Sequence, residues 1–164
     1  MWAFCDLVAG QSPAPAGVAS AAMTADLGLS LLIKTLAITG KRPDLMDAAR
    51  RESARLREAA AEDIAAVHEL MRSHDAEAML RAIEIPMRAA RAAAIGIDLS
   101  VEAASEVSGL LAADTGAAAA LLCGALRAIL ICVEANLRAQ PSEELAAECR
   151  TLEARAERMF KRTT

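Results

Sequence analysis

The stretch that decides the fold runs from Ala113 to Asn136 and reads ADTGAAAALLCGALRAILICVEAN. It contains no proline and no turn signal, and helix-forming residues occupy it throughout, so it predicts one helix over Asp114–Asn136, roughly 33 Å long. Large apolar residues recur along it at helical spacing and predict a buried stripe, namely Leu122, Leu126, Ile129 and Val133. Because this helix is apolar nearly all round, we expect the other helices to surround it.

Small residues form a second row along the same helix, at every fourth position. The row consists of Gly116, Ala120, Gly124, Ala128 and Cys132, and Asn136 continues it. Rows of this kind let another helix approach closely, so the row predicts a tight helix contact, either within one subunit or between two.

A membrane span is the rival interpretation of this stretch. Arg127 and Glu134 interrupt it, and charged side chains near the centre of a helix are costly in lipid. Much of the stretch is alanine, which is only weakly hydrophobic. A core helix of a protein with no membrane partner is therefore the preferred interpretation.

The composition of the 164 residues favours an all-α fold. Hydrophobic residues make up 55% of the chain and aromatic residues only 2%. A core built of alanine, leucine, isoleucine, valine and methionine suits closely packed helices, whereas strands favour aromatic and β-branched residues. We predict a single domain over residues 1–164, a bundle-like arrangement of five to six helices around the alanine-rich central helix.

Charge and cysteine usage narrow the classes of function. The formal net charge of −4 does not suggest a nucleic-acid partner. The four cysteines show no CxxC pairing, and they are interpreted as free thiols in a reducing, cytoplasmic compartment. The two histidines, His68 and His74, are six residues apart and do not share a helix face, so no metal site is predicted.

Turn and capping signals divide the rest of the chain. Gly40 is expected to end the second helix, Pro43 and Asp44 to open the third, and Pro86 to kink the fourth. Ile95–Asp98 is expected to break the chain before the next helix. The expected helices cover residues 3–9, 20–39, 44–73, 75–94, 99–111 and 114–136, with a last one after the capping residue Ser142.

Two features have both a structural and a functional interpretation. The segment Gln11–Gly17 reads QSPAPAG, and its two prolines hold the backbone extended, as a plain connector or as a preformed binding wall. Asp114 stands where the central helix is expected to begin, either as its N-cap or as a functional carboxylate.

The order of several short motifs resembles the cyclodeaminase/cyclohydrolase family, which comprises formiminotetrahydrofolate cyclodeaminase domains and methenyltetrahydrofolate cyclohydrolases. Ser12-Pro13-Ala14-Pro15 matches the first half of the family's Ser-Pro-x-Pro loop, and Gly40-Lys41-Arg42 resembles its Gly-Lys-Lys segment. Glu62-Asp63 falls where the family has Asp-Asp on its long charged helix. Ala113-Asp114-Thr115-Gly116 resembles the Ser-Asp-x-Gly that opens the family's central helix, and Asn136 stands at the second position of its Asn-x-x-x-Asn pair.

The chain departs from the family pattern at several of these places. Ala16 and Val18 replace two of three loop glycines, leaving only Gly17, and Ala19 stands where a serine is usual, with Ser20 one place on. Cys132 occupies the first asparagine position. The Asn-rich loop before the family's Ser-Asp is absent, and the chain is shorter than typical members. Glycines in such a loop permit positive φ and a close approach of backbone to ligand, which Ala16 and Val18 restrict.

The resemblance implies a folate one-carbon enzyme that interconverts formimino-, methenyl- or formyl-tetrahydrofolate, with no cofactor beyond the tetrahydrofolate substrate, and that forms a homodimer. Asp114 is then the expected catalytic acid/base, and the ligand site is expected where the Pro13–Gly17 loop meets the start of the central helix. Lys41 or Arg42 is expected to receive the carboxylate tail of the folate. The expected substrate-binding residues are Ser12, Pro13, Pro15, Gly17, Lys41, Arg42, Asp63, Gly116 and Asn136.

Two alternatives to an enzyme stay open at this point. The lost glycines and Cys132 suggest a degenerate, non-catalytic homologue that acts as a binding or assembly module. An unrelated helical interaction domain would instead use the row of small residues as its dimer face. Neither the motifs nor their spacing distinguish deamination from hydration.

Overall fold

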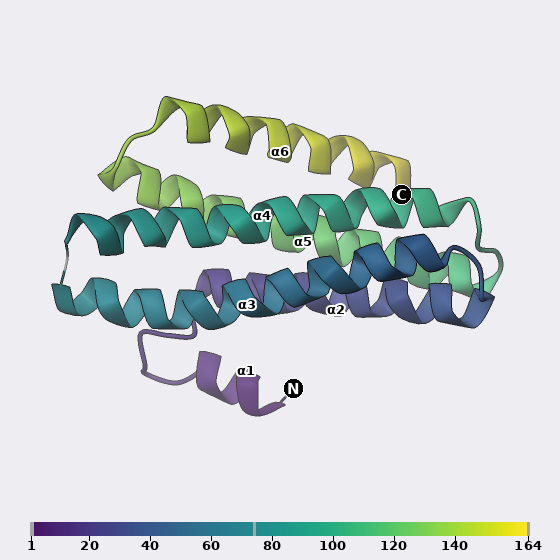
Figure 1. The fold of residues 1–164 in the computed structure, drawn as a ribbon, viewed down its shortest axis with the longest axis horizontal. Helices are drawn as coiled ribbons and strands as arrows, with labels where there is room; N and C mark the ends of the chain where they lie inside the picture. Colours follow the sequence, from purple (N-terminus) through teal and green to yellow (C-terminus); the bar gives the residue numbers. More distant parts are fainter. Residues whose placement is uncertain (1, 74, 164) are drawn as a thin grey trace.

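The computed structural model describes residues 2–73 and 75–163, and these form six helices and no strand (Figure 1). The fold is therefore all-α, as predicted. His74 lies outside the described residues. The helices are α1 (Trp2–Val8), α2 (Gly17–Thr39), α3 (Pro43–Ser73), α4 (Ala76–Ala104), α5 (Leu110–Ala139) and α6 (Glu143–Thr163).

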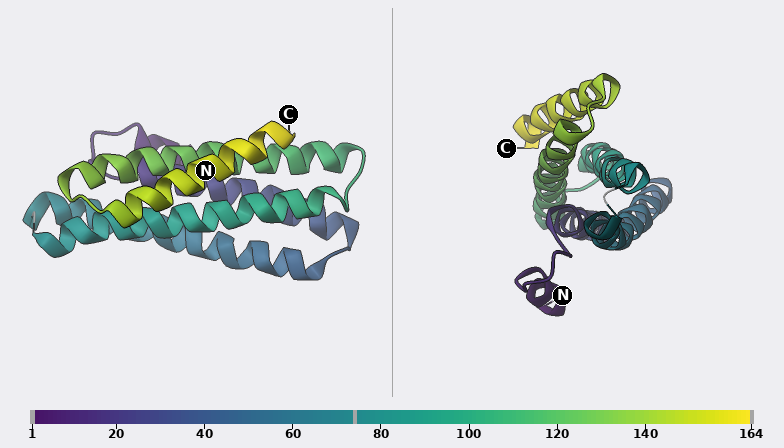
Figure 2. Two further views of the ribbon diagram at one scale, coloured as in Figure 1. Left: turned by 90° about the horizontal axis from the view of Figure 1, so that it is seen from above. Right: turned by 90° about the vertical axis from the view of Figure 1, so that its left-hand side faces the viewer.

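Helices α2 to α5 form an antiparallel four-helix bundle in which each helix packs on the next and α5 closes on α2 (Figures 1 and 2). Short connections between long helices produce this arrangement. Gly40 ends α2 with a φ of 65°, and its N–H donates to the carbonyl of Leu36, as expected of a glycine after a helix. Helix α6 lies across α4 and α5 on the outside of the bundle.

The core of the bundle is made of alanine and leucine. The predicted stripe on α5 is confirmed, since Leu122, Leu126, Ile129 and Val133 are all fully buried. Two glycines on other helices lie against the same leucine. A Cβ on Gly28 of α2 would be 3.0 Å from Leu122 Cγ, and a Cβ on Gly96 of α4 would be 2.9 Å from Leu122 Cδ2. Leu122 therefore marks the point where three helices approach most closely.

Two of the expected helix boundaries are wrong. Residues 76–104 form a single helix that runs through Ile95–Asp98, where a break was predicted. Gly96 is tolerated there because its missing side chain makes room for Leu122 and Leu29, so packing outweighs its low helix propensity. Helix α5 begins at Leu110, after Gly109 with a φ of 61°, and Asp114 lies inside its first turns instead of capping it.

The middle of the row of small residues on α5 has no helix packed on it, so the tight contact that the row predicts does not occur there within one subunit. A Cβ on Gly116 or Gly124 would meet nothing within 4 Å, and Ala120, Gly124 and Ala128 are exposed. The side of α5 that carries them has no helix over it (Figure 2). The central helix is thus enclosed on all sides but one.

Helices α2 and α5 are each long and apolar enough to cross a bilayer. Half of the residues in each apolar window are buried inside the bundle. Their apolar character is therefore largely accounted for by the core that they build, because core helices satisfy the same criteria of length and hydropathy.

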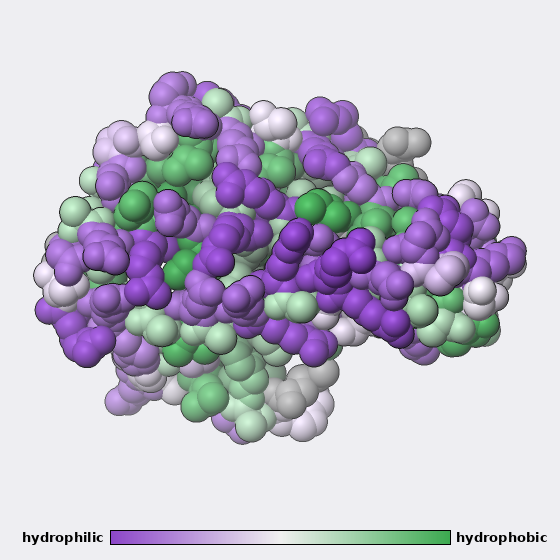
Figure 3. Space-filling view, viewed as in Figure 1, coloured by the Kyte–Doolittle hydropathy of each residue, from purple (hydrophilic) through white to green (hydrophobic). Residues whose placement is uncertain are grey.

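The outer surface differs from face to face. The face formed by α3 and α4 is largely hydrophilic (Figure 3). Several ion pairs join side chains of these two helices, such as Arg88 with Glu62. Helix α1 projects from the bundle, none of its residues is buried, and Trp2 is 78% exposed. Seven residues are too few for an isolated helix to be stable in water.

Gly28→Val is expected to lower the free energy of unfolding by about 1–3 kcal/mol, because the new side chain would meet the Ala118 carbonyl oxygen, 3.0 Å from its Cβ. Thermal unfolding by circular dichroism measures the effect. Gly116→Val is the matched control, since a Cβ there meets nothing within 4 Å. Equal losses of stability in the two variants would show that the α2–α5 contact is not as close as described.

Candidate functional site

A buried carboxylate on α3, Asp63, is the centre of the candidate site. Its side chain is only 5% exposed, and Oδ2 accepts a hydrogen bond of 3.2 Å from the backbone N–H of Ala19 on α2. Burial raises the pKa of Asp63, and this hydrogen bond lowers it by less. A carboxyl group with a raised pKa can exchange protons nearer to neutral pH than an exposed one, which suits general acid/base chemistry.

The other buried aspartate at the α2–α3 contact shows what a structural carboxylate looks like here. Asp26 accepts from Ser53 Oγ at 2.5 Å and from Arg57 Nε at 2.9 Å. Asp63 receives one backbone N–H and no cation in any ion pair among the described residues. This contrast in partners makes Asp63 a candidate for function, because buried charges are ordinarily paired.

Cys132 of α5 lies against the start of α2, the segment that also donates a hydrogen bond to Asp63. Burial, and then the charge of the Asp63 carboxylate, raise the pKa of the Cys132 thiol. A Cβ on Gly17 would lie 2.9 Å from Cys132 Sγ, so only glycine fits there without a shift of the thiol. The loop before it is anchored by Ala14 and Pro15, both buried and joined by a cis peptide bond, whereas Ser12 and Pro13 are exposed.

Asn136 lies one helical turn beyond Cys132 and borders a cavity. Its Nδ2 donates to the carbonyl of Ala82 at 2.7 Å, which fixes the amide. The cavity has a volume of about 300 Å³ and mostly apolar walls. Gln140 also lines it, and its Oε1 is buried without a hydrogen-bond partner among the described residues. The lining residues are Leu70, Met71, Met79, Ala82, Asn136, Ala139 and Gln140.

We call Gly17, the Ala19 N–H, Asp63, Cys132 and Asn136 the loop-end site. The start of α2 contacts both Asp63 of α3 and Cys132 of α5, and Asn136 with its cavity lies one turn farther along α5. Ser20, next along α2, has a buried hydroxyl oxygen that finds no partner in the described part of the chain. Such a site combines a buried acid with unsatisfied polar groups, which can form hydrogen bonds to a polar ligand.

Asp114 lies elsewhere in the subunit. It is 18 residues from Cys132 on the same helix, which corresponds to about 27 Å. Its side chain is 40% exposed, and Oδ2 lies 3.6 Å from Lys34 Nζ. Gly116 lies at the same end of α5. The expectation that the Pro13–Gly17 loop meets the start of the central helix is therefore wrong within one subunit, because α2 and α5 are antiparallel.

The Lys41–Arg42 segment lies at the Asp114 end of the bundle, where α2 ends. Arg42 donates to Asp44 and to Glu102, and these two hydrogen bonds, with Asp44 first, raise its pKa. Glu106 is 3.8 Å away. Three carboxylates therefore surround the guanidinium, an arrangement that holds the α3 N-terminus against α4 and does not suit binding of a folate carboxylate. Lys41 is exposed.

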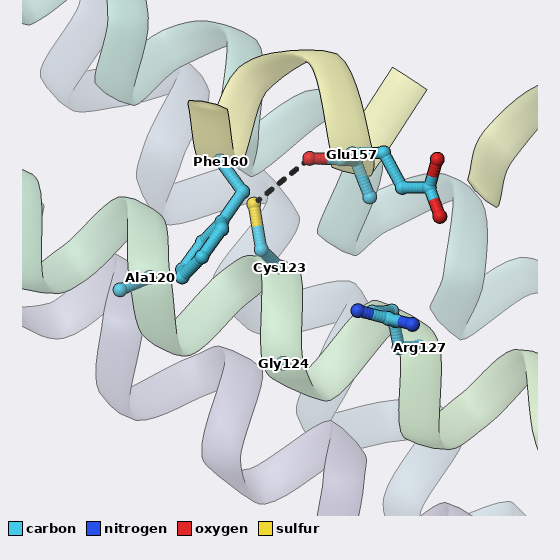
Figure 4. A pocket seen from close by; sticks show the side chains of 7 residues that line it. Ala120, Cys123, Gly124, Arg127, Glu157 and Phe160 are labelled. Atoms are coloured by element: carbon cyan, nitrogen blue, oxygen red, sulfur yellow. Dashed lines mark hydrogen bonds between the residues drawn. The ribbon is translucent and has the colours of Figure 1, made fainter. Parts of the chain in front are cut away.

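A second cavity lies between α5 and α6, with a volume of about 370 Å³ (Figure 4). Its floor contains Cys123, whose thiol is 3.7 Å from the Ala156 carbonyl oxygen. Arg127 on α5 and Glu157 on α6 border its mouth. It holds no buried carboxylate, and burial raises the pKa of Cys123. This cavity therefore lacks the groups that make the loop-end site reactive.

Among residues 2–73 and 75–163, no group of three or more histidine, cysteine or carboxylate side chains is placed to hold a metal ion. Cys5, Cys123, Cys132 and Cys149 are all free thiols. The chemistry that the loop-end site supports rests on proton transfer and on hydrogen bonds.

The sequence predicts Asp63 as a substrate-binding residue and Asp114 as the catalytic acid/base. It marks Cys132 only as a departure from the family pattern. The burial of Asp63 was the missing information. The hydrophobic spacing of α3 could have indicated it, because Asp63 lies seven residues after the buried Leu56 on the same face. The free oxygens of Ser20 and Gln140 carry no signal in the sequence.

Comparison with known proteins assigns this arrangement to a class. The family model described as Formiminotransferase-cyclodeaminase matches residues 1–155. The chain therefore belongs to the formiminotransferase-cyclodeaminase family. Its fold is that of a formiminotetrahydrofolate cyclodeaminase from Thermotoga maritima, with a TM-score of 0.86 and 22% sequence identity over 98% of this chain and 91% of that one. None of the curated proteins compared with the chain matches it.

Proposed function

We propose that the protein is a folate one-carbon enzyme of the cyclodeaminase/cyclohydrolase type, and that Asp63 is its acid/base group. The observation that carries the proposal is a buried carboxyl group that accepts one backbone hydrogen bond and has no cation partner among the described residues, in a chain of this family. The cavity beside Asn136 offers apolar walls and a free carbonyl oxygen to a ring that carries an amino group.

The main requirement of the reaction is a group held next to the one-carbon unit that can accept and donate a proton. In cyclodeamination, N10 of the folate attacks the formimino carbon, the methenyl bridge forms, and ammonia leaves. With the formimino nitrogen already protonated as an amidinium, that nitrogen gains one more proton before it leaves as ammonia and N10 loses one, so one carboxyl group can accept the proton from N10 and donate it to the leaving nitrogen. In hydration, the same group accepts a proton from the water that adds to the methenyl carbon.

The protein is expected to convert 5-formiminotetrahydrofolate to the methenyl form with release of ammonia, or to hydrate the methenyl form. Absorbance of the methenyl group follows both reactions, and an ammonia assay separates them. If the wild type neither turns over nor binds any of these folates, the proposal fails, and the alternative of a non-catalytic binding or assembly module is favoured by the exposed apolar side of α5.

Cys132→Asn tests whether the departure at this position limits the reaction. An amide next to Asp63 can donate a hydrogen bond to the carboxylate or to the ligand, which the thiol does weakly. Turnover is expected to rise several-fold, and Cys132→Ala, which also removes the thiol but adds no donor, is the control. An equal rate in both variants would show that a donor at this position has no role.

A further inference from the structure

A hollow of about 570 Å³ lies between α2 and α3, away from the loop-end site. Arginine and serine side chains make up its polar part, and no carboxylate is among the described residues that line it. Such a wall offers hydrogen-bond donors and positive charge to an anion. We call it the α2–α3 hollow, and its lining residues are Ser30, Ile33, Arg50, Ser53, Ala54 and Arg57.

Two hollows between α3 and α4 also contain arginines, but acidic residues line both of them. The first is lined on its charged side by Arg55, Arg88, Arg91, Glu52 and Glu58, and the second includes two glutamates as well. These acidic groups bind the arginines, as where Arg55 Nη1 donates to both carboxylate oxygens of Glu52, at 2.8 and 3.1 Å. An anion would meet like charges there, which the described wall of the α2–α3 hollow does not present.

Arg57 is held in place by a buried carboxylate. Its Nε donates to Asp26 Oδ2 at 2.9 Å, and Ser53 Oγ donates to Oδ1 of the same aspartate at 2.5 Å. Asp26 and Ser53 are buried, whereas the side chain of Arg57 is 63% exposed. The guanidinium is therefore anchored through Nε while the rest of the group faces solvent.

The terminal nitrogens distinguish Arg57 from the other paired arginines. Each other arginine in the described ion pairs brings a terminal nitrogen to a carboxylate oxygen. Arg57 bonds to Asp26 through Nε alone, and neither of its terminal nitrogens donates to a described residue. The terminal edge of a guanidinium carries two parallel N–H groups, which match two oxygens of one phosphate or carboxylate group.

Arg50 and Ser30 add donors on the two sides of the hollow. Arg50 lies seven residues before Arg57, about two helical turns or about 10 Å along α3. Its hydrogen bond to Asp47 is 3.3 Å long and exposed, so this pairing is weak. Ser30 of α2 is exposed, and its hydroxyl forms no hydrogen bond with a described residue. Both helices therefore present donors to the same space.

We propose that the α2–α3 hollow binds a small polyanion that carries phosphate or carboxylate groups. Arg57 is its main contact, and Arg50 and Ser30 are further donors. Two arginines two turns apart favour a ligand with more than one anionic group, because each group can then contact one guanidinium. Ser30 is 13 residues, or about 20 Å along α2, from Gly17. The site is thus separate from the loop-end site and does not depend on the proposed function.

Calorimetric titration of the intact chain measures the binding directly. Tripolyphosphate, citrate and inorganic phosphate are the probes, each at the same ionic strength so that screening is constant. Tripolyphosphate or citrate should bind about tenfold or more tightly than inorganic phosphate, and the tighter of the two identifies the phosphate or the carboxylate class. Equal affinity for all three probes, or no binding at millimolar concentrations, overturns the proposal.

Arg57→Lys tests the geometry of the contact, because lysine keeps the charge but lacks the paired N–H groups. The tighter probe should bind about tenfold more weakly, and Arg57→Gln should weaken it further. Arg51→Gln is the matched control, since it removes the same charge from an exposed position on α3 outside the lining. Equal losses in Arg57→Gln and Arg51→Gln would show that only the overall charge of α3 matters, and the site would be refuted.

Arg50→Gln provides a variant that leaves the contacts of the buried Asp26 untouched. It should weaken binding several-fold while the thermal unfolding temperature without ligand stays unchanged, because Arg50 has only an exposed partner. Unchanged affinity in this variant would contradict a ligand that contacts both arginines.

Amide chemical shifts from NMR locate the bound probe. The amides of Ser30, Ser53 and Arg57 should shift, whereas those of Ala19 and Cys132 should not. Shifts at the loop-end site in place of the hollow would overturn the proposal. Asp63→Asn should bind the polyanion as the wild type does, so a failure of folate turnover and a failure of polyanion binding are separate results.

Discussion

Asp63→Asn is expected to abolish turnover, by a factor of about 10² to 10⁴, while the folded protein becomes more stable at neutral pH. The amide retains an oxygen that can accept from the Ala19 N–H but has no ionised form to be desolvated. A buried carboxylate that lowers the stability of the folded protein is typical of a functional site, where activity and stability make opposite demands. Steady-state kinetics and thermal unfolding of the same preparation measure both effects.

The difference in stability between Asp63→Asn and the wild type should depend on pH, in a direction set by the pKa shift of Asp63. Burial raises the pKa of Asp63 in the folded state above the ordinary 3.8. Between the two values the folded state binds more protons than the unfolded state, so the free energy of unfolding falls as pH rises through that window. The higher free energy of unfolding of Asp63→Asn relative to the wild type should therefore be present at neutral pH and disappear as pH falls below about 3.8.

Asp26→Asn is the matched control, because Asp26 is equally buried but is paired with Ser53 and Arg57. This change should lower stability at neutral pH, since it removes charge from hydrogen bonds that are already made. Full turnover in Asp63→Asn would disprove the acid/base assignment. A loss of stability in both variants would show that Asp63 is a structural carboxylate like Asp26.

Leu122→Ala is expected to have the largest effect on stability, a loss of about 3–5 kcal/mol. The side chain is fully buried where α2, α4 and α5 meet, and its removal leaves a cavity that the helices cannot readily fill. A domain of ordinary stability has about 5–15 kcal/mol in total, so the variant should unfold at a much lower denaturant concentration. Urea unfolding followed by circular dichroism measures the change.

A second substitution should recover part of this loss. Gly96→Ala alone is expected to destabilise, because its Cβ would lie 2.9 Å from Leu122 Cδ2 and 3.0 Å from Leu29 Cδ2. In the Leu122→Ala background the first of these atoms is absent and the methyl group enters the cavity. The double variant should therefore be more stable than the sum of the single changes predicts. Strict additivity would contradict the close contact between Gly96 and Leu122.

The pattern of residues along the chain determined the class of fold and most of the buried faces. Leu122, Leu126, Ile129 and Val133 are buried as their spacing predicts, and Gly40 ends α2 as a residue free to adopt positive φ. These features depend on the geometry of one helix or one turn, so local sequence contains the information. The same pattern, with its order of short motifs, also identified the family.

Only the tertiary structure decided where the candidate site lies. The sequence alone predicts that Asp114, on α5, lies beside the proline loop that precedes α2. Because α2 packs antiparallel to α5, the two are instead at opposite ends of the bundle. The packing of the helices also buries Asp63, whose pKa depends on what surrounds it, and leaves Ala120, Gly124 and Ala128 exposed in the middle of the row of small residues. Helix periodicity fixes which residues share a face, while burial and proximity arise from the other helices, which are distant in the chain.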